Sequence, residues 1–276
     1  MGFSLKATST KNIWVGKFDV FDSPKFVHGI STRHGGCSGG TYQSLNLGLH
    51  VQDEATAVVS NRQAFLQSMG SDITQVVTCQ QVHGSRVVAV TAEDLGKGAT
   101  DFQEAIKDAD ALITNVPQVD LMLFFADCTP ILLADPVAGA IGVAHGGWKG
   151  TAAGIVIKTV AAMTKEYGTR PENVLAGIGP AIGPCCYQVG ENVEVEFQKN
   201  FPELMDQLFS RRDDKVFLNL WQANKLQLEK AGVLPANIDC AQVCTACNNS
   251  QFFSYRGDGS KTGRIAGVLG MRTRKD

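Results

Sequence analysis

Two apolar runs joined by a tight turn constrain the fold of this chain more than any other feature. The segment ADCTPILLADPVAGAIGVAHGG contains one apolar run at 131–134, turn residues at 135–139 and a second apolar run at 140–144. Asp, Pro and Gly at 135–139 are typical of a turn, so we predict that residues 131–144 form a β-hairpin. An uninterrupted apolar run is typical of a buried strand. The hairpin is therefore expected to be buried.

The outer ends of this hairpin carry residues that packing does not require. Cys128 precedes the first strand, and His145 ends the second one. Both outer ends of a hairpin lie at the same edge of a sheet, so we expect Cys128 and His145 to be neighbours. Thiols and imidazoles can act as metal ligands or as nucleophile and base. On spacing alone, a packed small cysteine and a locally hydrogen-bonded histidine are the alternative.

The remaining pattern predicts an α+β fold. Further strands are expected at 86–90, 111–114, 121–126, 174–178 and 265–269. Four helices are expected. The first has one apolar face from Val58 onward and ends at Gly70, and the second runs from 191 to Pro202. The third spans 151–167, and the fourth spans 220–231 with Asn219 as N-cap. Strands and helices do not alternate regularly, and no repeat or linker is evident. We therefore predict a single domain over 1–276, with mixed β-sheets flanked by helices.

Charge and composition narrow the function classes. The chain is 44% hydrophobic and 19% charged, with a net charge of −2 and an isoelectric point near 6.2. Such a balance gives no electrostatic footprint for nucleic acid. No apolar run is long enough for a membrane, and the polar start at 1–11 lacks the apolar core of a signal peptide. We expect a cytoplasmic protein with neither a nucleic acid nor a membrane as partner.

Three glycine-rich loops could line a binding site. The loop at 146–150 carries Lys149 and leads into the helix expected at 151, where an anion or a simple tight turn fits equally well. The loop at 32–38 places Arg33 beside flexible backbone, a setting suited to oxyanions. The loop at 177–186 could form the wall of a pocket.

The chain has eight cysteines, and three of them form a C-x3-C-x2-C pattern at Cys240, Cys244 and Cys247. No second pair follows at the distance usual for a zinc ribbon. We therefore expect buried free thiols there, with no part in catalysis.

Seven motifs, read together, resemble the YfiH/YlmD-type family. They are STRHGGCSGGTYQSLNLG, TCQQVHGSRV, DALITN, ADCTPILLADP, GVAHGGWKGT, GIGPAIGPCCYQVG and CTACNNSQFFSYRGDGSKTGRIAGV, which together run from about residue 29 to 267. The resemblance implies the YfiH/CNF-type putative cysteine-hydrolase fold. It also implies purine nucleoside phosphorylase, adenosine deaminase and methylthioadenosine phosphorylase activities. The family was long labelled a multicopper polyphenol oxidase or laccase, and some members are called peptidoglycan editing factors.

The resemblance further implies a zinc ion held by His83, Cys128 and His145, and copper would be a substitute in vitro. Three protein ligands leave zinc one open position, which suits activation of water for attack on C6 of adenosine. Asp127 would shuttle a proton or orient a ligand, or it would simply cap the strand end.

The same resemblance implies purine nucleosides and phosphate as partners, in a monomer or small homo-oligomer. Arg33, Lys149 and Arg256 are the candidate phosphate ligands, and Asn46 is a candidate sugar contact. Each of these four also fits an ordinary surface position, and only the loops that carry them recommend them.

Other functions are weighed against this one. Coupled copper sites need many imidazoles, usually in His-x-His pairs, and this chain has five histidines and no such pair. A laccase is therefore excluded. A cysteine amidase acting on peptidoglycan precursors, with Cys128 as nucleophile, is the second hypothesis. A non-enzymatic metal-binding protein is the third.

Overall fold

Two six-stranded β-sheets pack face to face in the computed structural model, which describes residues 2–10 and 12–272. Met1 and Lys11, within the polar start, lie outside the described residues. The first sheet has the order β1 (Phe3–Ala7), β2 (Trp14–Phe18), β3 (Phe26–Ser31), β15 (Ile265–Met271), β7 (Asp120–Phe125) and β4 (Val76–Val77). The second has the order β14 (Ile238–Cys240), β10 (Leu175–Ile178), β8 (Thr129–Asp135), β9 (Ala140–Gly146), β6 (Ala111–Thr114) and β5 (Val87–Ala89).

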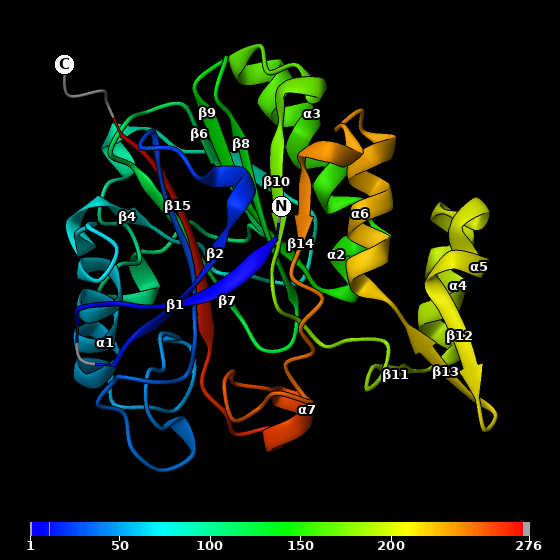
Figure 1. The fold of residues 1–276 in the computed structure, drawn as a ribbon, viewed down its shortest axis with the longest axis horizontal. Helices are drawn as coiled ribbons and strands as arrows, with labels where there is room; N and C mark the ends of the chain where they lie inside the picture. Colours follow the sequence, from blue (N-terminus) through cyan, green and yellow to red (C-terminus); the bar gives the residue numbers. More distant parts are fainter. Residues whose placement is uncertain (1, 11, 273–276) are drawn as a thin grey trace.

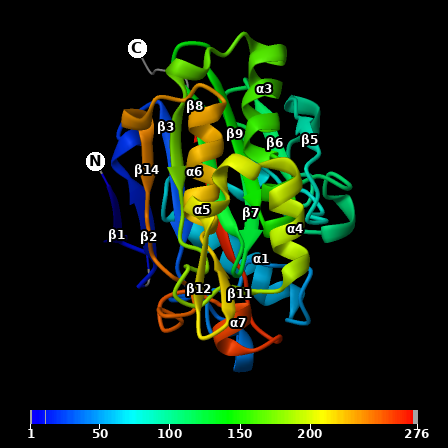
Figure 2. The same ribbon diagram turned by 90° about the vertical axis from the view of Figure 1, so that its right-hand side faces the viewer.

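Helices cover the outer faces of the two sheets (Figures 1 and 2). Helix α1 (Ala55–Gln67) lies against the first sheet, while α3 (Ile155–Tyr167) and α6 (Leu220–Lys230) lie against the second. A small third sheet of β11 (Gln188–Val189), β13 (Lys215–Leu218) and β12 (Phe209–Arg212) stands beside α4 (Glu191–Asn200) and α5 (Met205–Leu208). Both large sheets mix parallel and antiparallel pairs. The predicted α+β class with mixed sheets is confirmed.

The predicted hairpin is the centre of the second sheet. Strands β8 and β9 pair antiparallel, with Thr129 opposite Gly146 and Pro130 opposite His145. Along β8, Leu132 faces the core between the two sheets, whereas Leu133 faces the core beneath the helices. Because side chains alternate along a strand, a strand between two apolar layers must be apolar at every position. This explains the unbroken apolar run in the sequence.

Most predicted elements match the structure at their centres and differ at their ends. The Asn219 side chain accepts a hydrogen bond from the backbone N–H of Gln222 (3.1 Å), which confirms the predicted cap of α6. The single helix predicted at 151–167 is wrong, because two helices occupy this stretch. Helix α2 (Trp148–Ala152) ends before Gly154, whose φ of +75° interrupts the helix, and α3 begins at Ile155. Glycine adopts this left-handed conformation at little cost.

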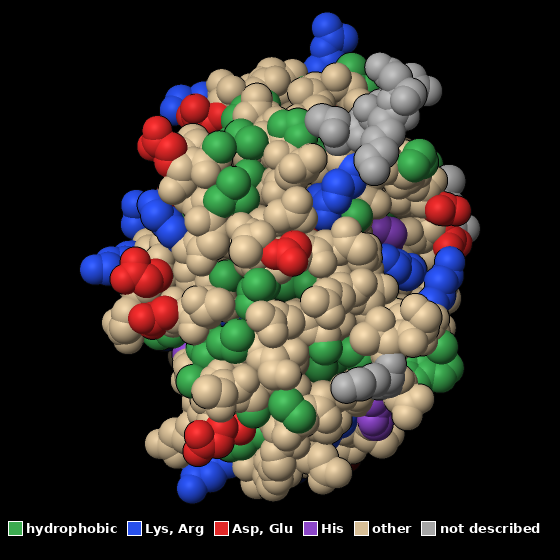
Figure 3. Space-filling model, turned by 90° about the vertical axis from the view of Figure 1, so that its left-hand side faces the viewer, with side chains coloured by type: hydrophobic (Ala, Val, Ile, Leu, Met, Phe, Trp, Pro, Cys, Tyr) green, Lys and Arg blue, Asp and Glu red, His purple; other side chains and the backbone are tan. Residues whose placement is uncertain are grey.

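Charges of both signs are interspersed on the molecular face shown in Figure 3, which lies on the left of Figure 1. This distribution agrees with the small net charge of the chain. Within residues 2–10 and 12–272, none of the helices combines the length and the apolar character that a bilayer span requires.

Candidate metal centre and cavity

Three side chains from separate segments meet at one edge of the second sheet. Cys128 directly precedes β8, His145 lies in β9, and His83 lies in the loop before β5. Their ligand atoms all lie within 4.8 Å of one another. The two imidazole rings are 4.8 Å apart at their centroids and inclined by 73°. The hairpin pattern predicted the Cys128–His145 pair, and only the family resemblance pointed to His83.

Asp110 forms hydrogen bonds with both His145 and the loop that carries His83. Its buried carboxylate lies 2.8 Å from Nδ1 of His145. The same carboxylate accepts hydrogen bonds from the backbone N–H groups of His83 (2.9 Å) and Gly84 (2.7 Å). Burial opposes ionisation of Asp110, but the hydrogen bonds from His145, Gly84 and Val82 hold its pKa below the ordinary value. An ionised Asp110 fixes the proton of His145 on Nδ1 and leaves Nε2 free to bind a metal.

Asp110, the first residue of the motif DALITN, is a site residue that sequence reasoning missed. A charged residue at the very start of an apolar strand was the available signal, since a buried carboxylate requires partners.

Cys128 and His145 favour opposite charges. Burial opposes ionisation of Cys128, but the positive charge of His145 and hydrogen bonds from His145 and His83 lower its pKa to about 6. Burial likewise opposes the charge on His145, but the Cys128 thiolate and Asp110 raise its pKa to about 9. In the absence of a metal, these shifts favour a thiolate–imidazolium pair at neutral pH.

Glycines allow the loop after β9 to approach the centre closely. A Cβ atom on Gly147 would lie 3.1 Å from Sγ of Cys128 and 3.2 Å from the ring of His83. A Cβ atom on Gly150 would lie 2.6 Å from the carbonyl oxygen of Gly84, which is too close for any real contact. Helix α2 can therefore lie directly on the His83 loop only because position 150 has no side chain.

A cavity of about 520 Å³ opens onto the three residues. Its lining includes five aromatic side chains of Phe, Trp and Tyr, and two cations, Arg256 and Arg264, also face it. The other lining residues are His50, Cys79, Gln81, Phe102, Phe124, Ala126, Asp127, Trp148, Ile182, Tyr187, Leu220 and Tyr255. A volume of this size lies in the range of small-molecule sites.

Of the four candidate substrate ligands, Arg256 lies in this cavity. Its guanidinium group donates to the backbone carbonyls of Cys186 (3.2 Å) and Gln188 (3.3 Å). Arg264 also lines the cavity but was not predicted. It follows Gly263 in the last motif, and its position before a strand gave no specific signal.

The structure places the other three candidates elsewhere. Arg33 forms an ion pair with Asp258 (3.1 Å) and lines a separate surface depression. Asn46 is fully buried, and its side chain accepts hydrogen bonds from the backbone of Gly48 and Arg264. Lys149 is exposed, with its ammonium group 5.6 Å from the ring centroid of Trp148, and it is not part of the cavity lining.

Asp127 joins the candidate metal centre to helix α7 (Tyr255–Asp258). One carboxylate oxygen accepts a hydrogen bond from the Thr245 hydroxyl group (2.6 Å), and the other accepts from the backbone N–H of Arg256 (2.8 Å). Asp127 thereby fixes the start of the helix that brings Arg256 into the cavity.

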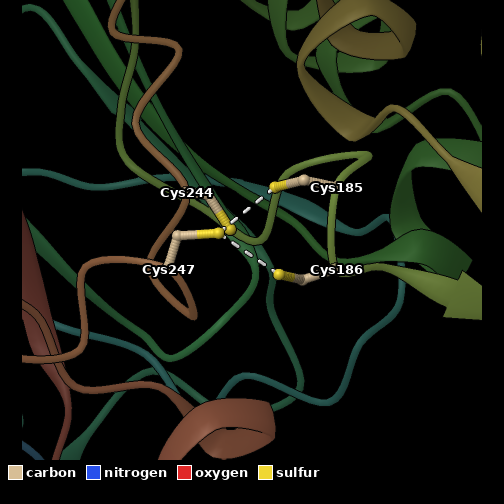
Figure 4. Close-up of side chains that lie close together, drawn as sticks. All are labelled: Cys185, Cys186, Cys244 and Cys247. Atoms are coloured by element: carbon tan, nitrogen blue, oxygen red, sulfur yellow. Dashed lines mark hydrogen bonds between the residues drawn. The ribbon is translucent and has the colours of Figure 1, made fainter.

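The C-terminal cysteines are free thiols, as expected, but they are not all buried. The four-cysteine pattern is also complete, because Cys244 and Cys247 lie beside Cys185 and Cys186 (Figure 4). The missing pair precedes them in the sequence instead of following, and Cys247 is exposed. Cys240, at the end of β14, takes no part in this group.

Comparison with known proteins gives consistent matches over most of the chain. The family model described as "Multi-copper polyphenol oxidoreductase laccase" matches residues 27–272. "Purine nucleoside phosphorylase YlmD" of Geobacillus stearothermophilus is 40% identical over 247 residues, which cover 89% of this chain and 90% of that protein. "Adenosine deaminase RL5", from an unknown prokaryotic organism, is 32% identical over 250 residues, which cover 90% and 95%. The crystal structure of YlmD from Geobacillus stearothermophilus matches with a TM-score of 0.89 and 37% identity, covering 98% of this chain and 99% of that one.

Proposed function

The chain belongs to the family whose model is described as multi-copper polyphenol oxidoreductase laccase, and on this premise we propose that it is a zinc-dependent purine nucleoside enzyme. It cleaves adenosine, inosine and methylthioadenosine with phosphate, and it deaminates adenosine. The observation that carries the proposal is a cavity in which a His–Cys–His group, two arginines and several aromatic side chains lie together. The names of the relatives, phosphorylase and deaminase, support both reactions.

The donor set fits zinc. His83, Cys128 and His145 supply two nitrogen atoms and one sulfur atom, all borderline or soft ligands. The lowered pKa of Cys128 favours the thiolate that a metal requires. A zinc ion bound by three protein ligands keeps one position open and supplies Lewis acidity at that position.

Different cavity residues would bind the nucleoside and the anion. Phe102, Phe124 and Tyr187 line the cavity and offer aromatic faces on which a purine base would stack. Arg256 is the cation that we assign to phosphate. Its guanidinium group is already positioned by carbonyl oxygens and keeps further N–H groups to donate to an oxyanion.

A comparison of two reactions tests this assignment. Hypoxanthine release from inosine should require phosphate, whereas ammonia release from adenosine should not, since deamination uses water. Arg256→Ala should lower phosphorolysis roughly 10- to 100-fold, because hydrogen bonds to a charged group contribute about 1.5–3 kcal/mol. Deamination should fall much less in the same variant.

Lys149→Ala is the matched control, because it removes a cation outside the cavity lining. Equal hypoxanthine release without phosphate would show that the protein is a hydrolase instead of a phosphorylase. Parallel loss of both reactions in Arg256→Ala would show that Arg256 positions the nucleoside or the loop and not phosphate.

A second candidate function is favoured by one observation. Cys128, His145 and Asp110 form a thiolate–imidazole–carboxylate series, which is the arrangement of a cysteine hydrolase. Turnover of a peptide amide by metal-free protein, together with trapping of Cys128 by an electrophile, would support that function. Loss of all turnover on chelation and its return with added zinc would exclude it.

A further inference from the structure

Four cysteine sulfur atoms meet on the side of the cavity formed by α7 and the loop after β10. Cys185 and Cys186 lie in the loop between β10 and β11, and Cys244 and Cys247 lie in the segment after β14. All four Sγ atoms lie within 4.8 Å of one another (Figure 4). We propose that Cys185, Cys186, Cys244 and Cys247 bind a second zinc ion, separate from the His–Cys–His centre.

The sulfur separations fit one tetrahedral ion. Sγ of Cys247 lies 3.5 Å from that of Cys185 and 3.3 Å from that of Cys186. Four Zn–S bonds of about 2.3 Å in tetrahedral geometry place sulfur atoms about 3.8 Å apart, within the range seen here. A disulfide would need about 2.05 Å between two of them. An iron–sulfur cluster would need room for several iron and sulfide atoms between the thiols, and the group is too compact for that.

The backbone also prepares a thiolate. The N–H of Gly183 lies 3.3 Å from Sγ of Cys244. Backbone N–H groups directed at a cysteine sulfur are the supporting hydrogen bonds that a thiolate ligand of a metal uses.

The position of the group gives the ion a structural task at the cavity. The Cys185–Cys186 loop continues into Tyr187, which lines the cavity, and the carbonyl of Cys186 accepts from Arg256. On the other side, Thr245 follows Cys244 and donates to Asp127. An ion bound by all four thiolates would therefore connect two loops that are distant in the sequence. Cys247 is 62 residues from Cys185 and 61 residues from Cys186. Together these loops hold Arg256 and Asp127.

Metal stoichiometry tests the site without reference to activity. Wild-type protein purified under reducing conditions should contain two zinc ions per chain by elemental analysis. The double variant Cys185→Ser/Cys247→Ser should contain one, while His83→Ala should lose the other ion and keep this one. Cys240→Ser is the matched control, because Cys240 lies on the same segment but outside the group, and it should keep both ions. Failure of the His–Cys–His proposal is thus distinguishable from failure of this one.

Cobalt spectroscopy covers the case in which the double variant does not fold. Titration of wild-type apoprotein with Co²⁺ should show a strong sulfur-to-metal charge-transfer band from four thiolates, in addition to the weaker band expected from the single Cys128 thiolate. Equal zinc content in wild type and folded double variant would overturn the site. So would a wild-type mass 2 Da low, with a disulfide mapped among the four cysteines of the reduced preparation.

Discussion

Asp110 connects the two histidines of the proposed centre. Its carboxylate meets Nδ1 of His145 and also accepts from the backbone of His83 and Gly84. His83 has a positive φ of 60°, a conformation that is unfavourable for a non-glycine residue. The hydrogen bonds from the His83 loop to Asp110 stabilise this conformation. Asp110 is thus a positioning residue that acts on both imidazoles.

Asp110→Asn should lower the zinc affinity of the His–Cys–His centre by about 10- to 100-fold. Oδ1 of Asp110 accepts from His145 and from the N–H of His83, while Oδ2 accepts from the N–H of Gly84. An amide has one acceptor oxygen, so on one of these two sides its NH2 group would face another donor. Competition with a chromophoric chelator measures the affinity. Asp135→Asn is the matched control: Asp135 is also buried, but it caps the turn at the far end of the same hairpin through one oxygen, which asparagine retains. Equal affinities in the two variants would contradict the role of Asp110.

The charge state of Cys128 gives a pH prediction for chelated, metal-free protein. Only the thiolate is alkylated, and the pKa of Cys128 is lowered from 9.0 to about 6. Iodoacetamide labelling of Cys128 should therefore rise with pH through about 6. Cys185 serves as internal control, because burial and its cysteine neighbours raise its pKa to about 11. Peptide mass spectrometry follows both residues, and a Cys128 midpoint near 9 would show that His145 does not stabilise the thiolate.

At the scale of elements, the local sequence pattern predicted the structures that depend on interactions between residues close together in the chain. The turn at 135–139 and the apolar runs on each side were sufficient for the hairpin, and hence for the Cys128–His145 pair. His83 and the four-cysteine group depend on contacts between distant segments, and no periodicity or spacing encodes these. The interruption between helices α2 and α3 at Gly154 was not predicted, because a glycine near the start of a helix does not by itself indicate a left-handed conformation.

Helix α2 gives a prediction at this scale. Gly150→Ala would place a Cβ atom 2.6 Å from the carbonyl oxygen of Gly84, so α2 and the His83 loop must separate. His83 should then bind zinc poorly, and the His–Cys–His centre should lose most of its metal while the fold persists. Gly39→Ala is the control, because its φ is −106° and its Cβ would meet nothing within 4 Å. Zinc content and far-UV circular dichroism together decide, and full occupancy in Gly150→Ala would contradict the packing argument.

At the scale of the molecule, both large sheets contribute residues to the lining of the cavity. Phe124 comes from β7 of the first sheet, and His145 comes from β9 of the second. The connection between β7 and β8, which crosses from one sheet to the other, carries Asp127 and Cys128. The core between the sheets contains Phe125, the last residue before this crossing, and Leu132, in the strand that follows it. A rigid interior thus supports the ligands, while loops from both sheets close the cavity.

In this arrangement, a metal bound at the proposed His–Cys–His centre would contribute to the stability of the whole molecule. A ligand that binds only the folded state at 100 times its dissociation constant adds about 2.7 kcal/mol to the free energy of unfolding. For a chain of 276 residues, that corresponds to a rise in Tm of roughly 5 °C. Calorimetry of the Cys185→Ser/Cys247→Ser variant, with chelator and then with excess zinc, isolates the His–Cys–His contribution. Adding His83→Ala should abolish most of the zinc-dependent rise, because two ligands cannot hold the ion as three do. An undiminished rise in that triple variant would mean that zinc stabilises the protein from another site.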